Sequence, residues 1–245
     1  MTPSAPDEPP GPPFDDPELE AVFARSSPAD TLAAVLTEAR AVLAEADGPL
    51  DAELWGSDIV AALGSGGDQT DAIVSAAEES GTPEALATLR VLGTVGSGAL
   101  RDAASAAAGR LAEAGVSDPG WAESIGAPSP GQCWSYGDVA GHQEAVTMTF
   151  WYGEQGHVVS VLVDRDQGGG IKDVWVGEAG DILDRTRQMS QEDPKVIFEM
   201  ITQADARARM DLALAAGECP EGPAESGNVA SRLAILRARV ALLQR

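Results

Sequence analysis

Three aspartates around a glycine-rich loop have the residue types and spacing closest to a chemical site. In the run from Asp164 to Ile171, Asp164 and Asp166 occupy positions one and three and Gly169 occupies position six. This spacing partly matches an oxygen-ligand calcium loop, in which carboxylates and a backbone carbonyl converge on a hard cation. Together with Asp173 farther along, these aspartates are the candidate metal ligands.

The match to a calcium loop fails at two other positions. Position five is Gly168 and position twelve is Trp175, so one essential ligand and the bidentate glutamate are absent. A glycine-rich connector between strands is therefore the preferred interpretation. Three successive glycines could also present backbone N–H groups to an anion, but the neighbouring aspartates oppose a phosphate. We expect no cofactor.

His142 and His157 are the only histidines, so any mechanism that uses histidine depends on one of them. His142 could meet Cys133, Asp138 or Glu144 near the open end of the predicted sheet, as a set of nucleophile, base and orienting group. With the three aspartates, His142 could also gather around a metal or a polar substrate. Structural or solvent-exposed roles for these residues are the simpler interpretation.

A β-hairpin is the first element needed to position these residues. Two β-branched and aromatic runs, 144–152 and 157–164, are separated by a loop of four residues. One register makes a whole face apolar, and a shift of one residue would turn every side chain to the other face. That register pairs Tyr152 with His157, Phe150 with Val159, Met148 with Val161 and Val146 with Val163. A third strand over 171–176 then gives a small antiparallel sheet.

Residues 27–117 are rich in alanine and leucine and predict a helical domain. Helix starts are marked by Ser or Thr before proline, and helix ends by glycine. The expected helices run from Ser27–Pro28 to Gly48, over 51–63 and 68–80, from Thr82–Pro83 to Gly96, and from Ser97 to Gly115. Their alternation, above all in residues 82–115, resembles the helical pairs of HEAT-type solenoids over less than half of the chain. The resemblance implies a concave binding surface.

Two further helices are expected after the sheet. Asp193–Pro194 begins a long helix that ends at Gly217, and residues 218–227 form a linker. The apolar side of the long helix is expected to hold Ile197, Ile201, Ala204, Ala208, Leu212 and Ala215. The last helix, 228–245, is amphipathic and carries four arginines and no acidic residue. We expect it to fold back onto the acidic body; a homodimer seam is the alternative, and calmodulin-like or membrane docking comes third.

The charge of the chain excludes two classes of partner. Its 245 residues include 39 acidic and 16 basic side chains, for a net charge of −23. Such a surface repels nucleic-acid phosphates and anionic lipids. Residues 1–26 are acidic and proline-rich and are expected to be disordered. Without a signal peptide or a membrane span we expect a cytoplasmic protein with free thiols at Cys133 and Cys219, and the composition is typical of a GC-rich bacterium.

Taken together, these patterns predict an α+β, mostly helical fold. HEAT-like helical pairs over 27–117 precede an α+β domain over 118–217, in which the small antiparallel sheet packs with C-terminal helices. The sequence contains no Walker loop, dinucleotide fingerprint, HExxH or GxSxG motif. The leading hypothesis is a non-catalytic protein-binding or regulatory scaffold. The alternative is an enzyme or metal-dependent protein with a site around Asp164, Asp166, Asp173 and His142.

Overall fold

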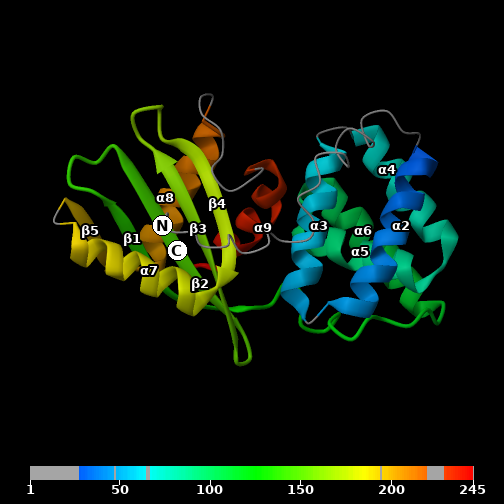
Figure 1. The fold of residues 1–245 in the computed structure, drawn as a ribbon. Coiled ribbons are helices and arrows are strands. Elements are labelled where there is room, and N and C mark those ends of the chain that lie inside the picture. Colours follow the sequence, from blue (N-terminus) through cyan, green and yellow to red (C-terminus); the bar gives the residue numbers. More distant parts are fainter. Residues whose placement is uncertain (1–27, 47, 65–66, 194, 220–228, 245) are drawn as a thin grey trace, which may run out of the picture.

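The computed structural model describes residues 28–46, 48–64, 67–193, 195–219 and 229–244. These residues form eight helices and one five-stranded antiparallel sheet, which confirms the predicted α+β class (Figure 1). None of the described helices has the length and apolar character that a membrane crossing requires. The predicted tail over 1–26 and most of the predicted linker lie outside the described residues. Along the chain the elements are α2 (Pro28–Glu45), α3 (Pro49–Leu63), α4 (Gly67–Ser80), α5 (Pro83–Val95), α6 (Gly98–Glu113), β1 (Ser129–Asp138), β2 (Gln143–Tyr152), β3 (Gln155–Asp164), β4 (Gly170–Glu178), α7 (Ala179–Glu192), β5 (Val196–Ile201), α8 (Gln203–Ala216) and α9 (Val229–Leu242).

The helices α2 to α6 form one unit with its own core. Helix α5 begins as predicted, because Thr82 Oγ1 accepts a hydrogen bond from Ala85 N (3.2 Å) ahead of the first turn. It packs against α2, α3, α4 and α6. In a solenoid each repeat contacts only its neighbours. The five predicted helices are therefore present, but their arrangement around α5 does not confirm HEAT-like pairing.

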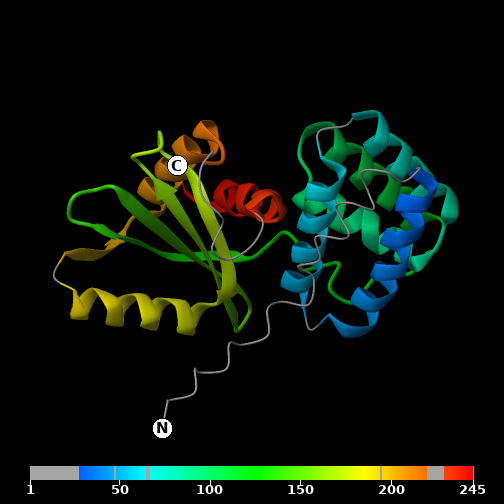
Figure 2. The same cartoon turned by 45° about the horizontal axis from the view of Figure 1, so that its top comes forward.

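The strands lie in the order β4-β3-β2-β1-β5. Helices α8 and α9 cover one face, and α7 crosses the other (Figure 2). Alternate residues of β2 and β3 point to the α8 and α9 side, where they join the second hydrophobic core. The fully buried members of this set are Val146, Met148, Phe150, Val159 and Val161.

The predicted hairpin is formed by β2 and β3, but the predicted register is wrong by two residues. Phe150 lies opposite His157 and Met148 opposite Val159, because the turn has two residues rather than four. Its first residue, Gly153, has a φ of +60°, which suits the first central position of a type II′ turn. A shift of two keeps every side chain on the same face, so the predicted apolar face is preserved.

The predicted helix over 193–217 is wrong in its first part. Residues 196–201 form β5, and α8 begins after Thr202, whose Oγ1 accepts a hydrogen bond from Asp205 N (3.0 Å). The run Val-Ile-Phe-Glu-Met-Ile suits a pleated strand, and pairing with β1 holds it in that conformation. The predicted face of α8 is also wrong, since Leu212 is 74% exposed. The buried residues of α8 are Ala206, Met210 and Ala213.

Strand β1 and helix α7 complete the sheet layers, and neither element is among those predicted from the sequence. β1 includes Pro130, Gly131 and Gly137, and its register with β2 shifts between Pro130 and Cys133. Glycine, proline and an irregular register all weaken the alternation by which a strand is recognised. Helix α7 is highly polar and holds only three large apolar residues among its 14, so its sequence offers few side chains by which a packed helix is recognised.

A buried polar network joins the helical unit to the sheet. Arg239 of α9 forms an ion pair with Glu53 of α3, and both side chains are 0% exposed. Arg239 Nε also donates to His157 Nε2 (3.0 Å), and the Tyr152 hydroxyl donates to Glu53 Oε1 (2.8 Å). The guanidinium lies 5.6 Å from the Phe150 ring centroid. Helix α3, the β2–β3 hairpin and helix α9, which are far apart in the sequence, are thus fixed to one another by satisfied polar groups.

Helix α9 folds back onto the acidic body, as the preferred interpretation requires. It lies between the helical unit and the sheet (Figure 1). Arg232 pairs with Asp58 (2.6 Å), and Ile235 N donates to Ser57 Oγ (3.2 Å). A dimer seam along α9 would need the same apolar residues that already contact the core of this chain. These are Val229, Leu236, Val240 and Leu243.

Candidate functional site: the open edge of the sheet

Strand β5 is held at the edge of the sheet by a capped turn at each end. Before it, Asp193 accepts hydrogen bonds from Lys195 N at its side chain (2.9 Å) and from Val196 N at its backbone carbonyl (3.0 Å). After it, Thr202 caps α8. These side-chain contacts to the backbone define where the strand begins and ends. They fix which six residues form the edge.

Only the inner side of β5 pairs with another strand. Strand β1 runs along residues 196–201, and Val139 N donates to Lys195 O (2.8 Å). In an antiparallel ladder alternate residues bond to the same neighbour, so the odd-numbered residues of β5 bond to β1. The even-numbered residues turn their backbone groups outward, where the described part of the chain places no strand. These residues are Val196, Phe198 and Met200.

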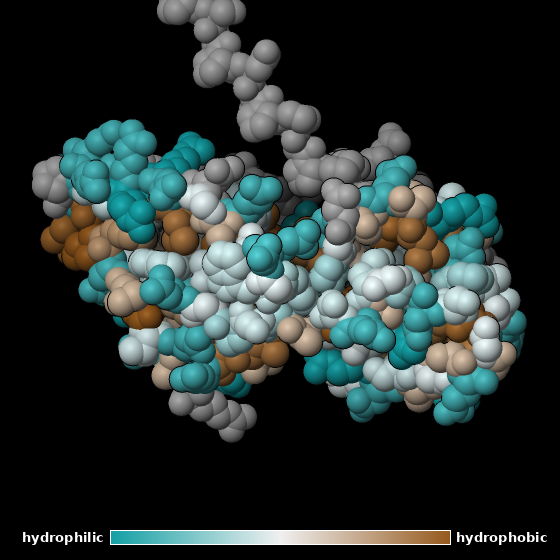
Figure 3. All heavy atoms as spheres, turned by 90° about the horizontal axis from the view of Figure 1, so that it is seen from below, coloured by the Kyte–Doolittle hydropathy of each residue, from teal (hydrophilic) through white to brown (hydrophobic). Residues whose placement is uncertain are grey.

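The side chains of β5 are unusually apolar for such an exposed position. Ile197 is 49% exposed and Met200 is 66% exposed. Seen from below in Figure 3, hydrophobic residues gather at the left-hand end of the molecule, where Figure 1 draws β5. Exposed apolar side chains beside unpaired backbone groups are the features by which an edge strand recruits another chain.

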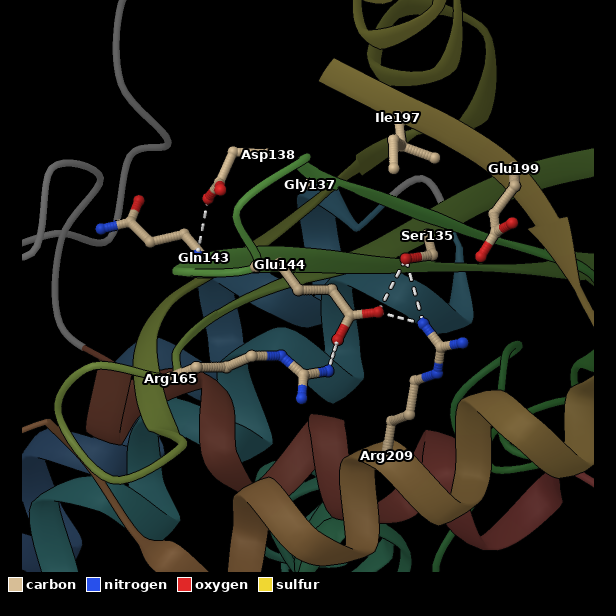
Figure 4. Close-up of a pocket in the computed structure, with 10 residues that line it drawn as sticks. Ser135, Gly137, Asp138, Gln143, Glu144, Arg165, Ile197, Glu199 and Arg209 are labelled. Carbon is tan, nitrogen blue, oxygen red and sulfur yellow. Dashed lines mark hydrogen bonds and ion pairs between the residues drawn. The ribbon is translucent and has the colours of Figure 1, made fainter. Parts of the chain in front are cut away.

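A polar pocket borders β5 on the α8 side of the sheet (Figure 4). At its centre Glu144 of β2 accepts hydrogen bonds from Arg165 and Arg209, and from Ser135 Oγ (2.7 Å). Arg209 of α8 also donates to Ser135 Oγ (3.0 Å). Glu199 of β5 lines the same pocket. The two guanidinium groups and the Glu144 carboxylate thus satisfy one another and tie α8 to the sheet.

The environment of Glu144 favours its ionised form. Burial by itself would raise the pKa of Glu144, but the Ser135 and Arg165 hydrogen bonds and the charges of Arg209 and Arg165 outweigh it and lower the pKa. The carboxylate oxygens already accept three hydrogen bonds. A general base needs an available lone pair within reach of the proton that it removes. Glu144 is therefore better suited to holding the arginines than to transferring a proton.

An indole-lined groove lies on the α7 side of the sheet. Trp134 of β1 and Trp151 of β2 line it together with Leu183 and Arg187 of α7. A Cβ at Gly156 would come within 2.6 Å of the Trp151 ring, so glycine at this position leaves room for the indole. The groove lies over β1 and β2, and its Trp134 pairs with Met200 of β5.

The predicted metal ligands lie in and beside the β3–β4 loop. Asp164 accepts hydrogen bonds from Asp166 N (3.1 Å) and from Lys172 Nζ (3.4 Å). Asp173 lies within β4, where its Oδ1 accepts from Val174 N (2.8 Å). The loop is a glycine-containing connector between β3 and β4, which is the interpretation that its sequence favours. Among the described residues, no group of three or more His, Cys, Asp or Glu side chains is arranged to hold a metal ion.

His142 contacts one of its predicted companions. Its Nδ1 lies 2.9 Å from the Asp166 carboxylate on the surface, and this hydrogen bond and charge raise the pKa of His142. Asp138 accepts the backbone N–H groups of His142 (3.3 Å) and Gln143 (3.0 Å), not the imidazole of His142. Cys133 is buried in the sheet core, and burial raises its pKa to about 11. The structure therefore brings His142 into contact with Asp166, and it pairs Glu144 with Arg165 and Arg209.

The edge strand is the feature that sequence reasoning missed. Its signal was present in the six-residue run of β-branched, aromatic and long apolar side chains that follows Pro194. Helical spacing between Ile197 and Ile201 competed with that signal. Both cysteines are free, as predicted.

Comparison of the chain with protein-family models, curated proteins and solved structures finds no match. Likeness to a known protein therefore contributes nothing to the assignment of function. The edge strand lies at the end of the sheet away from the helical unit (Figure 1). Its geometry is what bears on function.

Proposed function

We propose that this chain is a non-catalytic scaffold that binds protein by adding an extended strand to the outer edge of β5. In such binding, main-chain hydrogen bonds supply affinity and alternate side chains supply specificity. The added strand would bond to the outward groups of Phe198 and Met200. Its side chains would alternate between the polar pocket side and the indole groove side of the sheet.

One observation carries this proposal: β5 has an unpaired outer side and exposed apolar side chains, with Glu199 as its only charged residue. Natural edges are covered, bulged, or interrupted by proline and inward-pointing charge. Among the described residues no strand pairs with the outer side of β5, and residues 196–201 contain neither proline nor lysine. Instead the strand exposes Ile197 and Met200.

The rest of the molecule suits a rigid support for that edge. The Glu53–Arg239 pair fixes the helical unit to the sheet, and Arg209 fixes α8 beneath β1 and β2. The net charge of −23 disfavours nucleic acid and anionic membrane, which leaves protein as the partner class. We place the interaction in the cytoplasm, where the free thiols of Cys133 and Cys219 would stay reduced.

Site-specific photocrosslinking in the source cell tests this function. A photoreactive residue at Glu199 should form protein adducts that disappear when Met200→Pro is added, because proline removes an outward N–H without removing a bond to β1. Leu212→Lys, which alters an exposed apolar residue on α8, is the matched control and should leave the adducts unchanged. Adducts that persist with Met200→Pro, or no protein adduct at all, would contradict strand addition at β5.

A further inference from the structure

We infer that the strand added to β5 is β5 of a second copy of this chain, in an antiparallel pair centred on Phe198. This inference rests on the proposed function and names its partner. The pair would join two sheets into one of ten strands about a two-fold axis, an isologous contact in which the same surface serves both copies. Four arguments favour it.

The first argument is the match of backbone donors to acceptors. With Phe198 at the axis, Phe198 N–H of each copy meets Phe198 C=O of the other, and Met200 N–H meets Val196 C=O. Symmetry makes this four hydrogen bonds. The remaining outward donor is Val196 N–H, which already donates to Asp193 O (3.0 Å) within its own turn. The register therefore satisfies every outward donor of β5.

The neighbouring register is poorer. An axis at Ile197 would place Val196 N–H opposite Phe198 C=O, although Val196 N–H is already used by Asp193. It would also place Met200 opposite residue 194, a proline that has no N–H to return. Half of the pairing in that register loses its donor. An axis at Glu199 would also satisfy the N–H groups of Phe198 and Met200, but it would set the two Glu199 carboxylates directly opposite one another, which is destabilising. Backbone and charge together therefore favour Phe198 as the centre.

The second argument is apolar complementarity on the α7 side of the sheet. Phe198 would face Phe198 of the second copy, and Val196 would face Met200 of the second copy. Met200 is the most exposed apolar residue of the strand, at 66%. Arg187 of α7 already lies 6.0 Å from the Phe198 ring centroid, so the aromatic pair would form beneath a cation that stacks on it.

The third argument is charge complementarity on the α8 side. Lys195 and Glu199 are both exposed and flank Ile197 on this side. In the Phe198-centred pair, each Lys195 lies diagonal to Glu199 of the second copy, a separation that long side chains span. These two attractive contacts outnumber the single diagonal contact between the two Glu199 side chains. Ile197 would face the aliphatic part of Glu199. Each copy thus brings one cation and one anion to the contact.

The fourth argument is access. Figures 1 and 2 draw the helical unit and α9 at the opposite end of the sheet from β5. The pairing therefore brings the two sheets together without requiring either helical unit to move. Helix α7 packs against β5, so the two α7 helices would lie on the same face of the joined sheet. The contact can be made by rigid bodies.

Sedimentation of the purified full-length chain tests the pairing in solution. We expect twice the chain mass, with dissociation on dilution. Met200→Pro removes two of the four hydrogen bonds and should weaken the dimer at least about tenfold. Leu212→Lys should sediment like the wild type. A wild-type chain that stays monomeric, or a Met200→Pro dimer of unchanged strength, would overturn the inference.

Cysteine crosslinking tests the register and does not depend on a proline variant that folds. In a Cys219→Ser background, Phe198→Cys should give a disulfide dimer under mild oxidation, because opposed Cα atoms in a bonded pair lie about 5.5 Å apart. Ile197→Cys should not form a disulfide dimer, since Ile197 faces Glu199 of the second copy. Crosslinking at 197 instead of 198, or at neither, would overturn the proposal. If the chain is monomeric but Glu199 crosslinks another protein, the dimer fails and the proposed function stands.

Discussion

The two edge strands of the sheet use their backbone groups differently. At β4, Ile171 N–H donates to Gly217 O (2.8 Å) and Ile171 C=O accepts from Cys219 N (2.9 Å). Helices α8 and α9 also pack against β4. At β5, the described residues provide no such cover on the outer side. The chain thus bonds to β4 at Ile171, whereas the outer side of β5 stays unpaired among the described residues.

This difference separates stability from association. Near the covered edge, α9 carries the fully buried Arg239 into a site where it pairs with Glu53 and His157. Near the open edge, apolar side chains are exposed and few buried polar groups depend on them. Substitutions at the β4 end should therefore change the free energy of unfolding, and substitutions at the β5 end should change assembly.

Arg239→Ala should have the largest effect. It leaves the buried Glu53 carboxylate without its cation, which costs about 3–5 kcal/mol of unfolding free energy. The measurement is denaturant unfolding followed by circular dichroism. Arg237→Ala, on an exposed position of the same helix, should cost less than about 0.5 kcal/mol. Equal effects of the two variants on unfolding would contradict a stabilising role for the buried Glu53–Arg239 pair.

Acid should loosen the same network. Burial, and then the charge of Arg239, lower the pKa of His157 to about 3. The unfolded chain takes up this proton near pH 6.5, so stability is full above that pH and falls toward pH 3. We expect His157 to contribute a loss of about 3 kcal/mol by pH 4. His157→Gln, which retains an acceptor for Arg239, should flatten this part of the stability profile; an unchanged slope would contradict the assignment.

Gly170→Ala should weaken the closure of β4 by a smaller amount. A Cβ at position 170 would lie 2.9 Å from Gly217 O, in the segment that covers the strand. Overpacking of this kind costs about 1–3 kcal/mol, measurable by thermal unfolding. Gly109→Ala is the control, since a Cβ there meets nothing within 4 Å inside α6, and it should stabilise the chain by about 0.5–1 kcal/mol. A Gly170→Ala chain as stable as the wild type would mean that the segment at Gly217 does not pack tightly against β4.

Met200→Lys should have the smallest effect on stability. Met200 is exposed, so the free energy of unfolding of the monomer should change by less than about 0.5 kcal/mol. Assembly should weaken, because the lysine must approach the apolar Val196 of the second copy. Leu212→Lys should match it in stability and leave assembly unchanged. If both variants assemble like the wild type, β5 is not the contact.

The sequence predicted the parts of this fold that depend on local chemistry. In the N-terminal unit, Thr82–Pro83 marked the start of a helix and glycines marked helix ends, because caps act over a few residues. The hairpin faces were correct because alternation is a local property of a strand. Its register was not, because the position of the turn depends on whether Gly153 adopts a positive φ.

The candidate site could not be predicted in the same way. Residues 196–201 show helical spacing and β propensity together, and only pairing with β1 decides between them. Arg239 lies among other arginines on its helix, and its burial depends on Glu53, which is 186 residues away in the chain. The open edge is a property of strand order, which a single sequence does not display.

Amide hydrogen exchange along β5 at low and high protein concentration tests the central claim most directly. Ile197 N–H, which bonds to β1, provides the internal reference. We predict that exchange at Phe198 and Met200 slows as concentration rises while exchange at Ile197 stays constant. Exchange at Phe198 and Met200 that remains fast at every concentration would contradict pairing at the open edge.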